Sequence, residues 1–251
     1  SPAAAQPAAP PASHDMHDMP AHWMGKEQIA FLIYPGFTAL DMVGPHYMLT
    51  MLMGAKAHIV ARSRDPVASD TGLVFTPSAS FDECPADLDI LCIPGGTTGT
   101  LDAIRDEATL RFVRDRGGRA KLVTSVCTGS LVLAAAGLLT GYKATSHWVA
   151  KPLLAKFGAI PTEGRIVRDR NRITGGGVTA GIDFGLSLVA QLRDQPYAEA
   201  VQLLAEYAPE PPFNTGTPDK APQAKALLDT MFASFVANAE ATVLAALAQR
   251  K

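Results

Sequence analysis

Short apolar runs alternate with helix-forming segments from residue 29 onward, and this alternation limits the chain to few folds. The runs expected to form buried strands lie at 29–34, 56–61, 88–93 and 122–126. Helical spacing of apolar residues predicts helices near 44–53, 107–117, 131–136, 148–157, 179–193 and 196–207. Strands that alternate with helices are typical of a mostly parallel α/β sheet with helices on both faces. In such sheets ligands bind beyond the carboxyl ends of the strands, so functional residues are expected in the loops there.

Three further segments complete the predicted domain. Residues 73–76 are expected to form a short strand, and residues 165–174 a hairpin that turns at 170–171. After a Pro-rich loop, residues 223–249 predict a last helix, whose apolar residues recur every three to four positions. This stripe must be covered by the domain itself or by a second subunit. Its residues are Leu227, Leu228, Met231, Phe232, Phe235 and Val236.

The composition fits one globular domain over residues 26–251. Hydrophobic residues make up 47%, which excludes disorder throughout. The formal net charge is −2, whereas nucleic-acid binding requires a strong basic excess, so we expect no nucleic-acid partner. The uncharged stretch 122–142 has about the length of a membrane span, but its pattern changes from strand to helix. We therefore expect no membrane segment.

Residues 1–25 differ in composition from the rest of the chain, because they are rich in Ala and Pro and contain no Lys or Arg. Repeated prolines prevent a helix, and the segment has little to bury, so we expect a disordered tail. A start of this kind is typical of a chain that follows a cleaved export signal. The expected compartment is therefore the bacterial cytoplasm or, if such a signal precedes the tail, the periplasm.

The same tail concentrates soft metal ligands. Imidazole and thioether groups together suit copper or nickel. The alternative interpretation is a solvated tail that binds nothing, and both remain open. No metal site is predicted in the core. The residues in question are His14, Met16, His17, Met19, His22 and Met24.

Cys127 is the candidate nucleophile. It stands where the apolar run 122–126 ends and a helix begins, with the small residues Ser125 and Gly129 two positions away on either side. This is the cysteine counterpart of the nucleophile elbow, a sharp turn that presents its side chain above the sheet. The helix N-terminus behind Cys127 is expected to stabilise a thiolate. The alternative is a buried structural cysteine.

Other residues give weaker signals. Cys84 lies in a loop and Cys92 inside an apolar run, so both are expected to be structural. Three scattered cysteines are also too few for a disulfide framework. Gly95 and Gly96 follow the run 88–93, and an amide at this pair could complete an oxyanion hole.

Two residues are candidate proton partners for Cys127. Asp41 lies in the loop after the first strand and could act as a general acid and base, or only cap the following helix. His147 is more simply interpreted as a packed or capping residue. Thr128, and not a histidine, directly follows Cys127.

A set of sequence motifs then points to a family. The motifs are Tyr34-Pro-Gly36, Leu40-Asp-Met-Val-Gly-Pro-His46, Ile93-Pro-Gly-Gly-Thr97, Val123-Thr-Ser-Val-Cys-Thr-Gly-Ser-Leu-Val-Leu133, Ala144-Thr-Ser-His-Trp148, Thr174-Gly-Gly-Gly-Val-Thr-Ala-Gly-Ile-Asp-Phe184 and Glu206-Tyr-Ala-Pro-Glu-Pro-Pro-Phe-Asn214. Together they resemble the PfpI superfamily of glutamine-amidotransferase-like proteins, and within it the isonitrile hydratase family most closely. The last motif is the most specific, because it lies outside the general nucleophile machinery.

The resemblance implies a flavodoxin-like fold, a homodimer, and catalysis by a cysteine without a metal or other cofactor. By position, it implies that Cys127 is the nucleophile and Asp41 its carboxylic partner. Thr128 and Gly96, with Gly95 beside it, are implied to surround the reacting atom. Peptidases and deglycases of the superfamily usually carry Glu at the position of Asp41, and its peptidases carry His at that of Thr128. Both departures disfavour these activities.

The resemblance further implies a lyase that hydrates an isonitrile, R–N≡C, to an N-substituted formamide through a cysteine thioimidate. Two alternatives belong to other functional classes. AraC-type regulators carry a similar domain, but they add two helix-turn-helix units, and too few residues follow Phe213 for such a pair. The third possibility is redox sensing, which also requires a low-pKa thiol at Cys127.

Overall fold

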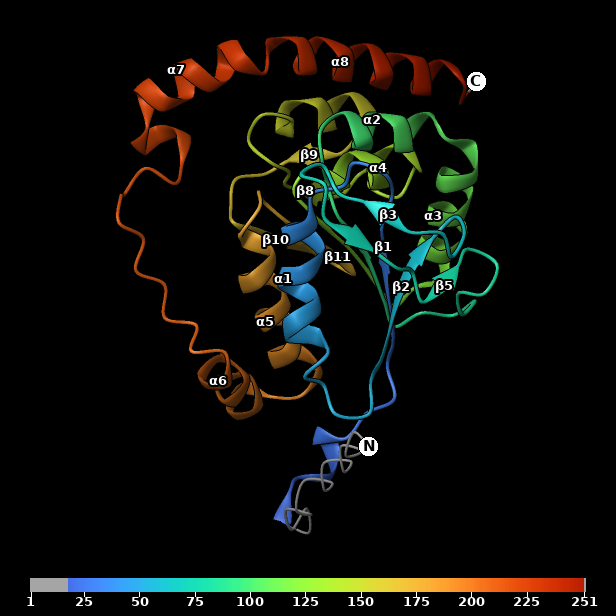
Figure 1. The fold of residues 1–251 in the computed structure, drawn as a ribbon, viewed down its shortest axis with the longest axis vertical. Coiled ribbons are helices and arrows are strands. Elements are labelled where there is room, and N and C mark those ends of the chain that lie inside the picture. Colours follow the sequence, from blue (N-terminus) through green and yellow to red (C-terminus); the bar gives the residue numbers. More distant parts are fainter. Residues whose placement is uncertain (1–17, 251) are drawn as a thin grey trace, which may run out of the picture.

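A seven-stranded sheet forms the centre of the protein in a computed structural model that describes residues 18–250 (Figure 1). The strand order is β10-β11-β7-β6-β1-β2-β5, and only β10 and β11 pair antiparallel. The predicted α/β class with a mostly parallel, flavodoxin-like sheet is confirmed. The strands are β1 (Gln28–Leu32), β2 (Lys56–Ala61), β5 (Ala79–Ser80), β6 (Ile90–Ile93), β7 (Leu122–Val126), β10 (Ile166–Asp169) and β11 (Arg172–Gly175).

Helices cover both faces of this sheet, which is why β6 and β7 are buried along their whole length. Figure 1 shows two helices on one face, α1 (Ala39–Leu49) and α5 (Ala180–Leu192). The other face carries α2 (Thr98–Arg105), α3 (Glu107–Arg119) and α4 (Gly129–Ala135). Glycine lets α1 and α5 approach closely, because a Cβ atom on Gly185 would lie 3.0 Å from the Cα atom of Pro45.

The remaining elements lie around this three-layer centre. Two short ribbons pair β3 (Val67–Ala68) with β4 (Val74–Phe75) and β8 (Lys143–Ala144) with β9 (Ile160–Pro161). Three short 3-10 helices are η2 (Ala21–Trp23), η3 (Lys151–Phe157) and η4 (Pro218–Lys220). The C-terminal part consists of α6 (Gln195–Leu204), α7 (Pro222–Met231) and α8 (Ala233–Ala248).

Several predicted elements differ in detail from the observed ones. The helix expected at 44–53 is α1, which begins at Ala39, directly after the loop that follows β1. The helix expected near 148–157 is the 3-10 helix η3. The last helix is two helices, α7 and α8, with a bend of 63° between them.

No single helix within residues 18–250 is long and apolar enough to cross a membrane. Within these residues, α7 and α8 reach such a length and hydrophobicity only when they are taken together, and a bend of 63° separates them. The uncharged stretch 122–142 is divided between β7, α4 and the turn after them, as its change of pattern predicts.

Residues 21–25, which lie in the segment expected to be a tail, contact the domain. Residues 21–23 form η2, and the Trp23 ring stands edge-on to the ring of Tyr197 with 5.2 Å between the centroids. The amide of Gly25 donates to the carbonyl of Met53 at 2.9 Å. Of the predicted soft ligands, His14, Met16 and His17 lie outside the described residues.

Candidate active site

Cys127 occupies the sharp turn between β7 and α4. Its φ of 59° lies in the left-handed region, which is rare for a residue with a side chain and costs on the order of 1–3 kcal/mol. The Cys127 amide donates to the carbonyls of Gly175 and Gly176 at 3.1 and 3.0 Å, and the Ser146 hydroxyl donates to the Cys127 carbonyl at 3.1 Å. These bonds hold the strained turn in place, so the predicted elbow geometry is present.

Glycines allow the loop after β6 to touch this elbow. A Cβ atom on Gly95 would lie 2.5 Å from the Thr128 nitrogen and from its Oγ1. A Cβ atom on Gly129 would overlap the carbonyl of Ile93. The glycine at each position is therefore required by close approach between two strand ends.

Asp41 reaches the same place from the first turn of α1. Its side chain is fully buried, and its Oδ2 accepts a hydrogen bond of 2.9 Å from the amide of Gly95. The other oxygen, Oδ1, is buried without a hydrogen-bond partner. The carboxyl thus bonds a distant loop and not an amide of its own helix, whose N-cap residue is Thr38. This geometry disfavours the capping role and leaves one oxygen available for chemistry.

The electrostatics of the pair follow from burial. Burial raises the pKa of Asp41 to about 7, although the Gly95 amide and the Cys127 thiol, which lies beside the carboxyl, both favour its charged form. Burial and the neighbouring Asp41 carboxylate together raise the pKa of the Cys127 thiol well above its usual value. Near neutral pH the site therefore holds a thiol next to a carboxyl that is half ionised.

The stabilisation of a thiolate by the helix N-terminus is outweighed by burial. The backbone bond at Thr128 does lower the Cys127 pKa, but burial outweighs it. Only 5% of Cys127 is exposed, so the charged form is poorly solvated. Asp41 is the ionisable group beside this thiol.

Thr128 links the elbow to the second glycine. The Gly96 amide donates to Thr128 Oγ1 at 2.8 Å, and the Thr128 hydroxyl donates to the Gly96 carbonyl at 2.6 Å. The Gly95 amide thus donates a hydrogen bond to Asp41, and the Gly96 amide donates one to Thr128. The structure brings together all five residues predicted for the core site, with the two amides holding side chains in place.

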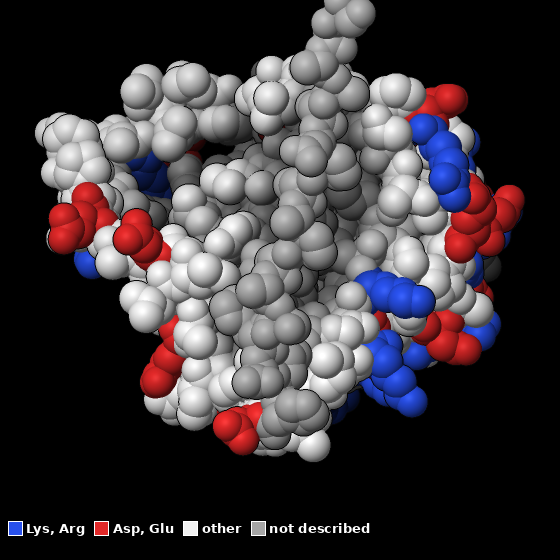
Figure 2. All heavy atoms as spheres, turned by 60° about the horizontal axis from the view of Figure 1, so that its bottom comes forward, with Lys and Arg blue, Asp and Glu red and all other residues white. Residues whose placement is uncertain are grey.

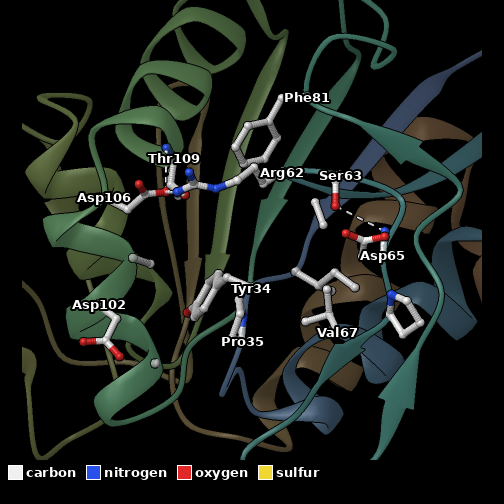
Figure 3. Close-up of a pocket in the computed structure, with 15 residues that line it drawn as sticks. Tyr34, Pro35, Arg62, Ser63, Asp65, Val67, Phe81, Asp102, Asp106 and Thr109 are labelled. Carbon is white, nitrogen blue, oxygen red and sulfur yellow. Dashed lines mark hydrogen bonds and ion pairs between the residues drawn. The ribbon is translucent and has the colours of Figure 1, made fainter.

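A hydroxyl network that the sequence did not reveal extends from Thr128. The Thr100 hydroxyl lies 3.1 Å from Thr128 Oγ1 and 2.9 Å from the hydroxyl of Tyr34, which donates to the Pro94 carbonyl at 2.6 Å. Tyr34 also borders a pocket of about 440 Å³, shown in Figure 3, whose rim carries the ion pair of Arg62 and Asp106. The Tyr34 side chain therefore stands between this pocket and the Thr128 network.

A second pocket, of about 500 Å³, lies against the main chain of the elbow. Among its lining residues, Ser146 and Gly176 both bond the backbone of Cys127. His147 also lines it, and its Nδ1 accepts from the amide of Val149 at 3.2 Å. This bond ties His147 to the turn that precedes η3, whose N-cap residue is Ala150.

The other cysteines are buried and free. Burial raises the pKa of Cys92 to about 12, and the Cys84 thiol lies 3.6 Å from the carbonyl of Pro85. Both fit the predicted structural role. Within residues 18–250, no group of three or more His, Cys, Asp or Glu side chains could hold a metal ion.

Comparison with known proteins places this geometry in a family. Residues 27–191 match the sequence profile of the DJ-1/PfpI family. The chain belongs to the DJ-1/PfpI family. It is 50% identical to the isonitrile hydratase of Pseudomonas putida over 197 residues, which cover 78% of this chain and 86% of that protein.

Two further similarities extend the comparison. A crystal structure of a THiJ/PfpI family protein from Pseudomonas syringae superposes with a TM-score of 0.88 at 58% identity, covering 94% of this chain and 97% of the other. The HTH-type transcriptional regulator GbdR of Pseudomonas aeruginosa is 32% identical over 191 residues, which cover 72% of this chain and 51% of the regulator. The DJ-1/PfpI domain therefore occurs both in an enzyme and in a regulator.

Proposed function

We propose that this protein hydrates an isonitrile to an N-substituted formamide, with Cys127 as nucleophile and Asp41 as the group that moves protons. The observation that carries this proposal is the buried pair itself, a strained thiol beside a carboxyl whose Oδ1 has no partner. The 50% identity to an isonitrile hydratase supports the same substrate class.

The low exposure of Cys127 favours this substrate over bulkier electrophiles. Only 5% of the residue is accessible, and its sulfur lies at a narrow turn. The reactive carbon of an isonitrile is the terminal atom of a linear group, so it can reach a nearly buried thiol. A peptide carbonyl is flanked by chain on both sides and cannot approach in the same way.

The first step adds the thiol across the terminal carbon. As the Cys127 sulfur forms a bond to this carbon, the Asp41 carboxylate takes the thiol proton. The carbon keeps a lone pair, which then accepts the proton from Asp41. The product is the thioimidate Cys127–S–CH=N–R, and the carboxylate is restored.

The second step adds water to the thioimidate. Asp41 accepts a proton from water as the water oxygen bonds to the carbon, and it passes this proton to the nitrogen, which becomes N–H. The resulting S–CH(OH)–NH–R collapses by breaking its C–S bond, and the hydroxyl proton returns through Asp41 to the Cys127 sulfur. Release of R–NH–CHO regenerates the thiol, so one water is consumed per isonitrile.

The amides of Gly95 and Gly96 serve this chemistry by positioning. The Gly95 amide fixes Oδ2 of Asp41, which leaves Oδ1 for the proton transfers. The Gly96 amide fixes Thr128 beside the nucleophile. We propose these positioning roles in place of the oxyanion hole that the glycine pair suggested.

Redox sensing through Cys127 is less well supported. Oxidation-sensitive thiols are exposed and have low pKa values. Cys127 is nearly buried, and its pKa is raised. A ligand-sensing role, as the similarity to GbdR suggests, requires the same domain but no turnover.

The test is an assay of the purified chain with an aryl isonitrile, followed by loss of the isonitrile infrared band and appearance of the formamide. Multiple turnovers per protein molecule are expected. A single stoichiometric adduct, or binding without product, would contradict the enzymatic proposal and favour a sensor.

We also propose that the protein acts as a homodimer in which α7 and the start of α8 meet a second subunit. The predicted apolar stripe lies there, and the chain's own domain covers only part of it, since Phe235 packs against the core. Leu227 and Met231 are 62% and 65% exposed, respectively. A dimeric mass in light scattering, reduced by Leu227→Lys, would support the proposal, whereas a monomeric wild-type protein would contradict it.

A further inference from the structure

Methionines gather at the end of the molecule opposite the candidate active site. Of the eight methionines in the chain, Met19 and Met24 lie in the N-terminal segment, and Met51 and Met53 in the turn between α1 and β2. This turn precedes a parallel strand, so it lies at the amino ends of the sheet, whereas Cys127 lies at the carboxyl ends. The functional proposal above makes no use of this end.

Three of these side chains line one pocket. Met19, Met51 and Met53 surround a volume of about 210 Å³ together with Trp23 and Tyr197. Leu52, between the two methionines of the turn, is buried in the core, whereas Met51 and Met53 both line the pocket, together with Ala200, Val201 and Leu204 of α6. We call this feature the methionine pocket.

The N-terminal wall of the methionine pocket is anchored through Trp23. The Trp23 indole N–H donates to Asp194 at 2.8 Å, and the Arg193 guanidinium donates to the Trp23 carbonyl at 2.6 Å. Arg193 is itself held by a buried ion pair with Glu27 at 2.5 Å. The segment that carries Met19 is therefore fixed to the domain just after that residue.

The opposite wall is held by the same neighbours. Tyr197 donates from its hydroxyl to the Met51 carbonyl at 2.5 Å and accepts from the Met53 amide at 3.0 Å. Arg193 donates to the Met53 carbonyl at 2.9 Å. Arg193 and Tyr197 therefore fix the backbone of both walls, from which the three methionine side chains extend into one space.

The chemistry of this space suits a soft monovalent cation. Thioethers are neutral, soft ligands that select Cu(I) over hard dications. The Trp23 ring adds an aromatic wall of the kind that attracts cations. Figure 2, which views this end of the molecule, shows Lys and Arg mostly toward the right edge and Asp and Glu at both the left and the right edges.

We propose that the methionine pocket binds one Cu(I) ion through the thioethers of Met19, Met51 and Met53. The sequence that leads into Met19 continues the same ligand chemistry with His14, Met16 and His17. Simple packing of methionine against aromatic rings is the competing explanation. The two differ in whether leucine, which fills similar space but lacks sulfur, can replace the methionines.

The experiment is a titration of the full chain with Cu(I), without oxygen and against a chromophoric Cu(I) chelator. Binding of one equivalent is expected. The double variant Met51→Leu/Met53→Leu should bind more than about tenfold more weakly, while Met231→Leu, a change on the distant helix α7, should have no effect. Repeating the titration with Cys127→Ala separates thioether binding from binding by the catalytic thiol, and so keeps this test independent of the proposed activity.

A second measurement does not depend on the variants folding. In wild-type protein labelled at the methionine methyl groups, redox-inert Ag(I) should shift the NMR signals of Met19, Met51 and Met53. The signals of Met42, Met48 and Met231 should stay in place. An unchanged affinity in the double variant, or shifts that miss Met51 and Met53, would overturn the proposal and show that any copper bound is held by the tail or the thiols.

Discussion

The Gly95 amide donates to Oδ2 of Asp41 at 2.9 Å and ties the first turn of α1 to the loop after β6. This bond determines which of the two carboxyl oxygens has no hydrogen-bond partner. The remaining Oδ1 is buried without a partner, and the carboxyl stands beside the Cys127 thiol. A buried polar atom without a partner costs about 1–3 kcal/mol, so its retention is best explained by function.

Replacing Asp41 by Asn should lower the turnover rate by roughly two to four orders of magnitude. Asn can still accept the Gly95 hydrogen bond, but it cannot carry the proton. The measurement is kcat with an aryl isonitrile, and Asp102→Asn on the exposed side of α2 is the matched control. A near-native rate in Asp41→Asn would show that the carboxyl has only a structural role.

The rate should depend on pH through the same carboxyl. Asp41 must be ionised to accept the thiol proton, and its pKa is about 7. We therefore expect kcat/KM to rise with pH through an apparent pKa near 7 and then level off, because the Cys127 pKa lies well above this range. A profile that instead falls as the pH rises from 6 to 8 would assign the active form to a protonated Asp41.

The free energy of unfolding should also depend on pH through Asp41. The folded pKa of Asp41, about 7, lies above the usual value of 3.8, so the folded state holds this proton more tightly than the unfolded state. The corresponding stability is present below about pH 4 and is lost as the pH rises to about 7. Asp41→Asn removes the effect.

Urea denaturation of both proteins at several pH values measures this difference. The free energy of unfolding of Asp41→Asn, relative to wild type, should increase by on the order of 4 kcal/mol between pH 4 and pH 7. A difference that stays constant with pH would mean that Asp41 titrates normally.

The N-terminal segment should contribute to stability from about residue 20. A chain that begins at Asp18 keeps the bonds of Trp23 to Asp194 and Arg193, whereas a chain that begins at Gly25 loses them. The shorter chain should be less stable by about 2 kcal/mol, because Arg193 and Asp194 each lose a hydrogen bond to Trp23. Thermal denaturation of the two truncated chains compares them directly. Equal melting temperatures would contradict this prediction and support a tail that extends to residue 25.

Local patterns predicted much of the fold for identifiable reasons. The run that became β7 is bounded by turn residues and buried throughout, and both β2 and β7 occur within the predicted limits. Helix α2 was missed because its first turn, Thr98-Gly-Thr100, has low helix propensity, and its tertiary contacts compensate. The elbow at Cys127 was predictable because it needs small neighbours in sequence.

Long-range contacts were beyond such patterns. The bond between Asp41 and Gly95 joins residues 54 positions apart, and the Tyr34–Thr100 contact joins residues 66 apart. The raised pKa of Cys127 could not be predicted, because it depends on burial, which no local motif reports. The sequence also indicated candidate soft ligands in the tail, among them Met19. It could not show that Met51, in the turn after α1, lines the same pocket as Met19.

The most direct test of the proposed chemistry is the turnover of a ¹³C-labelled aryl isonitrile by wild-type protein and by Cys127→Ala, followed by NMR. Cys84→Ala and Cys92→Ala serve as matched controls, since both thiols are buried and structural. Wild type and both controls are predicted to produce the labelled formamide, and folded Cys127→Ala to produce none above the uncatalysed rate. Formamide production by Cys127→Ala at the wild-type rate, or none by wild type, would contradict the assignment of Cys127 as the nucleophile of an isonitrile hydratase.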